Sequence, residues 1–141
     1  MISDELKEII DLLKSQGKMH FIEAADDEHI VKFEADNDIQ FPSKYKEWLR
    51  FSDGGEFFLP AGVQLYGVAH KPLINVEDDD RPDDSYIVIG ALASGDPVLC
   101  QKNGEKIFVY DHEAGEIDEE LIYEDFFAFL KDLYDLLGIG E

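Results

Sequence analysis

The chain has a single cysteine, Cys100, among its 141 residues. One cysteine excludes an internal disulfide and any zinc site built from several cysteine ligands. Basic residues are also scarce, with 12 Lys and Arg against 33 Asp and Glu and a formal net charge of −21. Such a chain repels nucleic acid and anionic lipid, because phosphate groups need cationic partners. We therefore expect it to bind neither nucleic acid nor membranes.

Long apolar runs are missing as well. No stretch approaches the length of about 18 apolar residues that is needed to span a bilayer. The N-terminal sequence MISDELKEII is acidic and lacks the basic segment and apolar run of a secretory signal. Together with the lone cysteine, these features predict a protein of the cytoplasm.

Motifs for nucleotide and metal binding are absent too. No GxxxxGK[ST] or GxGxxG segment follows a predicted strand, and the four histidines have no HxH or HExxH spacing. An EF-hand loop counted from Asp78 fails, because Pro82 stands where a ligand is required. We expect a non-enzymatic protein without a cofactor or a bound metal.

Helical patterns occur at both ends of the chain. Ser3 can cap a first helix, in which the apolar residues between Leu6 and Leu13 recur on one face. Asp26 or Asp27 can begin a second helix. The segment from Tyr123 to Leu137 is the most apolar helix of the chain and is predicted to cover a sheet.

Residues 39–55, IQFPSKYKEWLRFSDGG, are the most informative segment. Pro42 suits the start of a third helix, where its missing N–H has no helical partner to lose. Gly54 and Gly55 suit the end of that helix, where a left-handed backbone is unstrained only without a Cβ. The side chains expected on the buried face of this helix are Tyr45, Trp48 and Leu49.

The middle of the chain favours strands at Phe57–Leu59, Val63–Val68 and Tyr86–Ala91, followed by the hairpin sequence PVLCQKNGEKIFVY. In the hairpin, Asn103-Gly104 is the pair favoured by a two-residue type I′ turn, which needs positive φ at both positions. That turn predicts four cross-strand pairs: Gln101 with Lys106, Cys100 with Ile107, Leu99 with Phe108, and Val98 with Val109.

The predicted register has two consequences. Both faces of the hairpin are substantially apolar, so we expect the sheet to be covered at least partly on both sides. The register also places His112 roughly 17 Å beyond the partner of Cys100, at about 3.4 Å per residue. A nucleophilic triad of Cys100, His112 and Asp111 is therefore excluded, and Cys100 is predicted to be a core residue.

A turn around Glu113–Gly115 and a short strand at Glu116–Asp118 precede the last helix. Helices, then a run of antiparallel strands, then a covering helix make an α+β fold. No repeat, low-complexity linker or composition boundary divides the chain, so residues 1–141 are predicted to be a single domain.

Two acidic clusters are candidates for binding a partner, and we expect both to lie on loops, where binding residues concentrate. Each could instead be a solvated surface that only keeps the protein soluble. The residues proposed to contact a partner are Glu77, Asp78, Asp79, Asp80, Asp83 and Asp84 in the first cluster, and Glu113, Glu116 and Asp118 in the second.

The order of these segments resembles the SUKH superfamily, which includes the fungal Smi/Knr cell-wall regulators and many bacterial toxin-immunity proteins. The resemblance rests on HIVKFEADNDIQFPSKYKEWLRFSDGG, on IVIGALASGDPVLCQKNGEKIFVY and on the Phe-rich EDFFAFLKDLYDLL, and it covers residues 26–137. Asp53 stands where Asn is common in the family, and Phe41 stands where Leu is usual.

The resemblance implies an antiparallel sheet of about six strands, flanked by N-terminal helices and covered by a C-terminal helix. It also implies an immunity protein that binds and neutralises a cognate bacterial toxin. We expect that toxin to be a basic, nuclease-type domain, and we expect this chain to be a monomer or a weak dimer. The alternative is a regulatory scaffold of the Smi/Knr cell-wall type.

Overall fold

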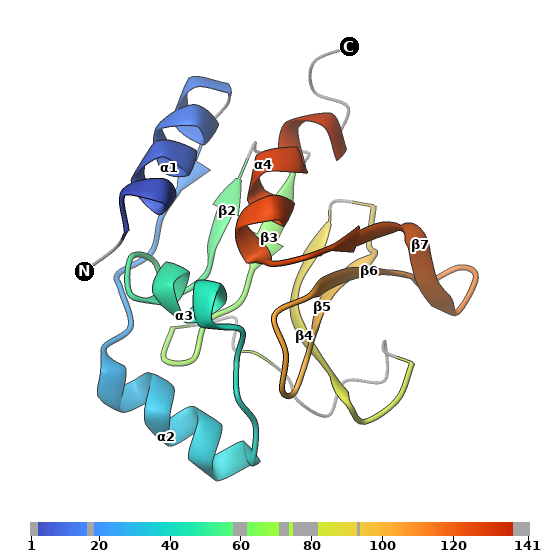
Figure 1. Ribbon diagram of the computed structural model, residues 1–141, viewed down its shortest axis with the longest axis horizontal. Helices are drawn as coiled ribbons and strands as arrows, with labels where there is room; N and C mark the ends of the chain where they lie inside the picture. The colour runs from blue at the N-terminus through green and yellow to red at the C-terminus, as the bar shows by residue number, and fades with distance from the viewer. Residues whose placement is uncertain are drawn as a thin grey trace.

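The computed structural model describes residues 3–16, 19–57, 62–70, 74, 82–92 and 94–136. Within these residues the chain forms seven strands and four helices (Figure 1). Their bounds, in chain order, are α1 (Asp4–Gln16), β1 (Met19–His20), α2 (Asp27–Asn37), α3 (Ser43–Leu49), β2 (Gly55–Phe57), β3 (Val63–Leu65), β4 (Tyr86–Leu92), β5 (Pro97–Gln101), β6 (Ile107–Asp111), β7 (Glu116–Tyr123) and α4 (Phe126–Leu136).

The seven strands form one antiparallel sheet, in which each strand pairs with the next one along the chain. This arrangement confirms the predicted α+β fold with N-terminal helices and a C-terminal covering helix. The described sheet has one strand more than the expected six or so. The strand that no local pattern predicted is β1, which is only two residues long and pairs with β2 at the edge of the sheet.

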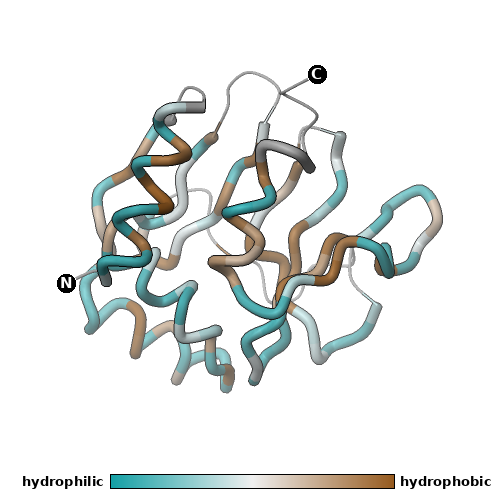
Figure 2. The backbone as a smooth tube through the Cα atoms, turned by 45° about the horizontal axis from the view of Figure 1, so that its top comes forward, coloured by the Kyte–Doolittle hydropathy of each residue, from teal (hydrophilic) through white to brown (hydrophobic). Residues whose placement is uncertain are grey.

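The helices begin where their caps predict. The backbone N–H of Leu6 donates to Ser3 Oγ at 3.2 Å, and the N–H of His29 donates to Asp26 Oδ1 at 2.9 Å. Asp38, in the left-handed region at φ 53°, closes α2. Figure 2 shows hydrophobic residues concentrated along the central strands, whereas α2 is mostly hydrophilic.

The main core lies between the sheet and the helices α1, α3 and α4, with α4 in front of β3 in Figure 1. Trp48 of α3 is fully buried, and its ring centroid lies 5.2 Å from that of Phe57 and 6.1 Å from that of Phe126. The predicted core positions Tyr45 and Leu49 are also fully buried. Aromatic contacts therefore join α3, β2 and α4 into one unit.

The opposite face of the sheet carries a smaller cluster, as the two apolar faces of the hairpin predicted. Leu99 and Phe108 are buried there beside Val88, whereas Cys100 and Ile107 point into the main core. Three of the four predicted cross-strand pairs of the β5–β6 hairpin are confirmed. The fourth, Gln101 with Lys106, is wrong, because β6 begins only at Ile107.

The predicted type I′ turn is nevertheless wrong, because neither Asn103 nor Gly104 has a positive φ. A contact with a distant segment of the chain overrides the preference of Asn103-Gly104 for a type I′ turn. The N–H of Gln40 donates to the carbonyl of Lys102 at 2.6 Å, and Gln40 and Asn103 form an isolated parallel bridge. The segment before α3 thus pairs with the hairpin tip.

Several predicted boundaries are also wrong. The strand predicted at Val63–Val68 ends at Leu65, and the short strand predicted at Glu116–Asp118 extends to Tyr123. Gly54 and Gly55 do not end α3, which stops at Leu49; with φ of 99° and 130° they turn the chain into β2. Tyr123 belongs to β7, where it pairs with Ile107, and α4 begins only at Phe126. The reason is Asp125, whose Oδ1 accepts the N–H of Ala128 at 2.8 Å as an N-cap does.

Three other predicted positions, Phe58, Leu59 and Leu137, lie outside the described residues. None of the helices in the described part of the chain is both long and apolar enough to cross a membrane.

Candidate protein-interaction surface

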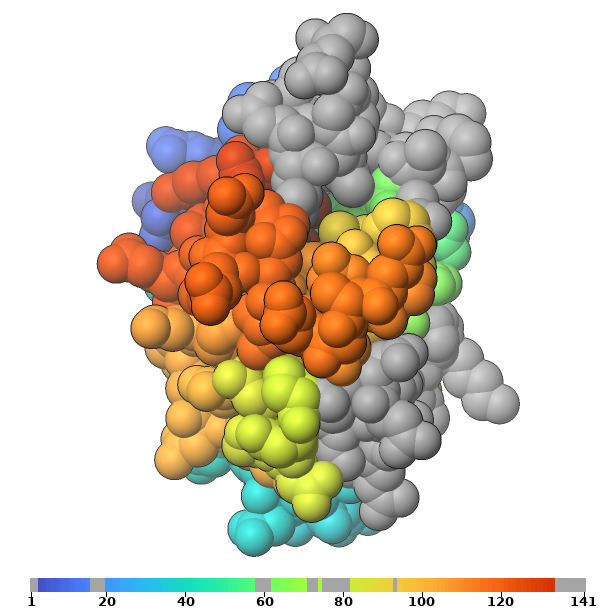
Figure 3. All heavy atoms as spheres, turned by 90° about the vertical axis from the view of Figure 1, so that its right-hand side faces the viewer, coloured from blue at the N-terminus to red at the C-terminus, as the bar shows by residue number. Residues whose placement is uncertain are grey.

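Acidic side chains gather where β6 passes into β7. Figure 3 shows this region in orange, on the same face as the yellow-green segment that precedes β4. We call the carboxylates of these segments the acidic face. Its members are Asp83, Asp84, Asp111, Glu113, Glu116, Asp118, Glu119 and Glu120.

A bulge in β7 displays three of these carboxylates, those of Asp118, Glu119 and Glu120. Tyr110 pairs with Ile117 and Phe108 pairs with Ile122, so the four residues 118–121 stand opposite Val109 alone. The N–H of Glu120 donates to Asp118 Oδ1 at 3.0 Å and stabilises the bend. The expectation that the second cluster lies on a loop is therefore wrong for its β7 members.

A shallow groove of about 400 Å³ runs along this bulge, and its lining is almost entirely acidic. The lining residues are Asp111, Glu116, Ile117, Asp118, Glu119 and Glu120. Acidic side chains and bulges on an edge strand also discourage pairing with another sheet, which is a structural role that these residues can fill without any partner.

Positive charge lies elsewhere in the described part of the chain. Five Lys or Arg side chains form ion pairs with carboxylates, and every one of these basic residues belongs to α2, α3, α4 or the end of α3. The pairs are Lys32–Asp36 at 2.8 Å, Lys44–Asp125 at 2.7 Å, Lys46–Glu34 at 3.5 Å, Arg50–Asp27 at 2.6 Å and Lys131–Glu5 at 3.1 Å. Among described residues, no Lys or Arg pairs with a carboxylate of β6, β7 or their turn.

The structure thus brings the predicted residues Glu113, Glu116 and Asp118 onto the same face as Asp83 and Asp84. The other four, Glu77–Asp80, lie outside the described residues. Sequence reasoning considered Asp111 only as a triad member and did not place it on this surface. Asp111 reaches this surface because it ends β6 and pairs with Glu116 across the β6–β7 turn.

A second notable site is the buried carboxylate of Asp53, which is fully shielded from solvent. Its Oδ1 accepts the N–H of Val68 at 2.7 Å, and its Oδ2 accepts the N–H groups of Ala69 at 2.8 Å and His70 at 2.7 Å. The imidazole Nδ1 of His70 lies 2.8 Å from the same Oδ2. A buried charge is tolerated when it is hydrogen-bonded in this way.

The Asp53 contacts fasten the segment after α3 to the segment after β3. Ser52 adds to this junction, because its Oγ accepts the N–H of Ile22 at 2.9 Å and donates to the carbonyl of Gly54 at 2.8 Å. Sequence reasoning missed this role and noted Asp53 only as a departure from the Asn that is common in the family. No sequence signal marks the donors, which are backbone groups.

The aromatic residues of the same motif are structural. Trp48 Nε1 donates to the carbonyl of Gly54 at 3.0 Å, and the Tyr45 hydroxyl donates to the carbonyl of Tyr66 at 2.6 Å. Burial raises the pKa of Tyr45 well above its ordinary value, so the hydroxyl stays a donor. The predicted motif of Pro42, Tyr45, Trp48, Leu49, Gly54 and Gly55 therefore builds the junction between α3, β2 and β3.

Comparison with protein families identifies this arrangement of helix, motif and sheet. Residues 24–132 match the SMI1/KNR4 family (SUKH-1). The chain belongs to this family. A comparison with curated proteins found no match. The match spans α2 to α4 and confirms the resemblance seen in the sequence; α1 and β1 precede it.

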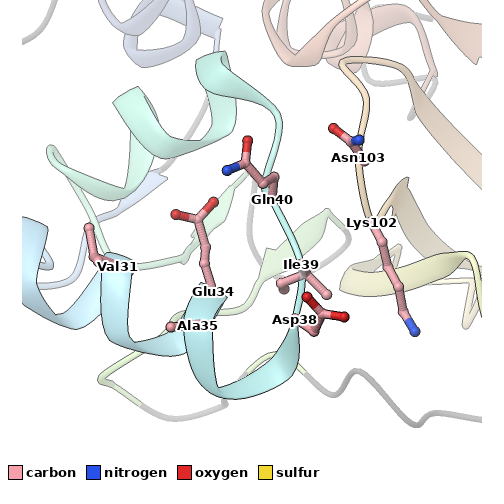
Figure 4. A pocket seen from close by; sticks show the side chains of 8 residues that line it. All are labelled: Val31, Glu34, Ala35, Asp38, Ile39, Gln40, Lys102 and Asn103. Carbon is pink, nitrogen blue, oxygen red and sulfur yellow. The ribbon is translucent and has the colours of Figure 1, made fainter.

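A second groove of this SUKH domain, about 450 Å³, lies between α2 and the β5–β6 hairpin tip (Figure 4). Glu34, which lines it, already accepts the N–H of Phe41 at 2.8 Å and lies 3.5 Å from Lys46 Nζ. Gln40 and Asn103 contribute amides. The described residues that line this groove include no Ser, Thr, Cys or His.

The residues once considered for catalysis are also separated in the SUKH domain. Burial raises the pKa of the Cys100 thiol, which keeps it protonated and unreactive. His112 is hydrogen-bonded to Asp96 instead. Within the described ranges, no group of three or more His, Cys, Asp or Glu side chains is placed to hold a metal ion.

Proposed function

We propose that this SUKH domain is an immunity-type protein that binds and neutralises a basic bacterial toxin. Domains of this family commonly serve as immunity proteins, and the chain belongs to the family over residues 24–132. The observation that carries the proposal is the separation of charge: the five basic side chains that form ion pairs do so around the helices, and among the described residues the carboxylates of β7 have no Lys or Arg partner.

This separation favours binding of a cationic surface. The β7 carboxylates have no ion pair with a described Lys or Arg, so no such pair must break before they meet a partner's Lys and Arg. A field of one sign also speeds the encounter with an oppositely charged protein. The active site of a nuclease is cationic because it binds phosphates, so the acidic face would cover it without making or breaking a bond.

Co-expression with the toxin gene encoded beside it tests the function. We expect cells to survive with this protein and to die without it. Cells that die equally fast in both cases would contradict the proposal. Recovery of several cellular proteins and no toxin in a pull-down would favour the regulatory scaffold instead.

A charge-reversal pair tests the surface separately. Glu116 and Glu119 are exposed on β7, and the double variant E116K/E119K should slow toxin association about tenfold at low salt. The matched control is E8K/D11K, which changes the net charge equally on α1, at the far side of the molecule in Figure 1. Equal slowing by both variants would mean that overall charge, rather than the acidic face, steers the encounter.

A further inference from the structure

Asp96 and His112 join two turns at the same end of the sheet. Asp96 closes the β4–β5 turn, in which its carbonyl accepts the N–H of Leu92 at 2.9 Å. Its carboxylate Oδ1 accepts the backbone N–H of His112 at 3.3 Å and also bonds to the imidazole Nδ1. His112 belongs to the β6–β7 turn. The Asp96 side chain of the first turn therefore bonds the backbone N–H and the ring Nδ1 of a residue in the second turn.

Gly95 makes room for this contact. Its φ is 97°, and a Cβ at this position would lie 3.3 Å from His112 Cε1 and 3.6 Å from His112 Nε2. The imidazole therefore lies directly over a backbone that only glycine adopts without strain. Two neighbouring residues of the β4–β5 turn therefore contact the imidazole: Gly95 leaves space for it, and Asp96 bonds to it.

We propose that Asp96 and His112 form a proton-dependent latch that holds the β4–β5 turn against the β6–β7 turn. With a protonated imidazole the contact is an ion pair with a charge-assisted hydrogen bond, and with a neutral imidazole only a weaker hydrogen bond is left. The latch goes beyond the proposed binding function, since it needs no partner. Its state nevertheless sets the position of Glu113 and the local charge of the acidic face.

The charges around the ring support this assignment. Asp96 faces it from the β4–β5 turn, and Asp111 and Glu113 face it from its own turn. The hydrogen bond to Asp96, helped by attraction to all three carboxylates, raises the pKa of His112 above its ordinary value. Stabilisation is therefore complete below the unfolded pKa of about 6.5 and is lost as the pH rises through the higher folded value.

Proton NMR of the His112 ring through a pH titration tests the pairing. We expect the His112 pKa to fall in D96N, and each unit of that fall corresponds to roughly a tenfold weaker closing of the latch. The control is D26N, which removes the carboxylate of a second aspartate–histidine pair, in which His29 Nδ1 lies 2.7 Å from Asp26 Oδ1 at the start of α2. The His112 titration should be unchanged in this variant. An unchanged His112 titration in D96N would overturn the proposal.

Backbone ¹⁵N relaxation tests whether the pair restrains the turns. We expect order parameters at residues 94–96 and 112–115 to fall together from about 0.85 once His112 loses its proton. In H112Q they should be low at every pH, whereas H29Q should behave like the wild type. Order parameters that stay constant through the titration, or that are unchanged in H112Q, would show that the pair restrains neither turn.

Discussion

A Cβ atom on Gly67 would lie 2.6 Å from the Oδ1 atom of Asp53 and 2.5 Å from its carbonyl oxygen. Both distances are shorter than real Cβ contacts. The backbone therefore reaches Asp53 at this point only because residue 67 has no side chain. The next residue, Val68, then donates its N–H to the same carboxylate.

Replacing Gly67 with alanine should be strongly destabilising. The new methyl group must push the backbone away from Asp53, which strains the junction and weakens the buried hydrogen bonds. We expect a loss of about 2–4 kcal/mol in the free energy of unfolding, measured by urea titration.

The matched control for Gly67→Ala is Gly104→Ala at the tip of the β5–β6 hairpin. There a Cβ would meet only the flexible end of Gln101, at 3.3 Å, and Gly104 has no positive φ. We expect a change within about 0.5 kcal/mol. A large loss of stability in Gly104→Ala would indicate a positive φ at residue 104, as the type I′ turn requires. An unchanged stability of Gly67→Ala would contradict the close approach of residue 67 to Asp53.

Asp53→Asn tests whether the junction needs a carboxylate rather than any polar side chain. Oδ2 accepts two backbone N–H groups and lies within hydrogen-bond distance of the His70 ring. An amide NH₂ in its place is itself a donor, so it cannot accept these N–H groups. We expect a loss of about 2–4 kcal/mol in the free energy of unfolding. The exposed Asp36, paired with Lys32, gives the control: Asp36→Asn should cost about 0.5 kcal/mol or less.

The sequence predicted those features of the fold that depend on local patterns. Alternating apolar residues fixed both faces of the β5–β6 hairpin, so Cys100 and Leu99 were assigned correctly to opposite sides. The caps Ser3 and Asp26 were also predictable, because a cap bonds within its own first turn. The turn at Asn103 was not, since its conformation depends on Gln40, about sixty residues away in the chain.

The candidate site was predictable in composition but not in geometry. The sequence identified Glu116 and Asp118 as acidic, yet it could not reveal the bulge that places four β7 residues opposite Val109. Nor could it show that the Asp53 carboxylate is buried, because its partners are backbone N–H groups that any residue carries. The role of Glu116 and Asp118 as partner contacts stays a prediction, and the charge-reversal experiment tests the surface to which they belong.

Asp125 should make the stability of the protein sensitive to acid. Burial alone would raise the pKa of Asp125, but the hydrogen bond from Lys44 and the N–H of Ala128 lower it overall. The stabilisation is therefore present above the unfolded pKa of about 3.9 and is lost as the pH falls through the lower folded value.

Asp125→Asn isolates this charge, because asparagine keeps an oxygen that can cap α4. We expect the variant to be less stable than the wild type at neutral pH, with the difference shrinking as the pH falls below about 4. Urea unfolding across that range measures it. A difference that stays constant with pH would mean that the Lys44–Asp125 pair contributes no charge-dependent stability.

The thiol of Cys100 should react only when the protein unfolds. It is fully buried, and burial raises its pKa, so the thiolate that attacks an alkylating reagent does not form in the folded state. With a global stability of at least about 5 kcal/mol, alkylation of the native protein should be more than about a thousandfold slower than in denaturing urea. Iodoacetamide labelling followed by mass spectrometry measures both rates, and Cys100→Ala sets the background. Comparable rates in the two conditions would mean that the thiol is reachable in the fold, and a nucleophilic role for Cys100 would then have to be reconsidered.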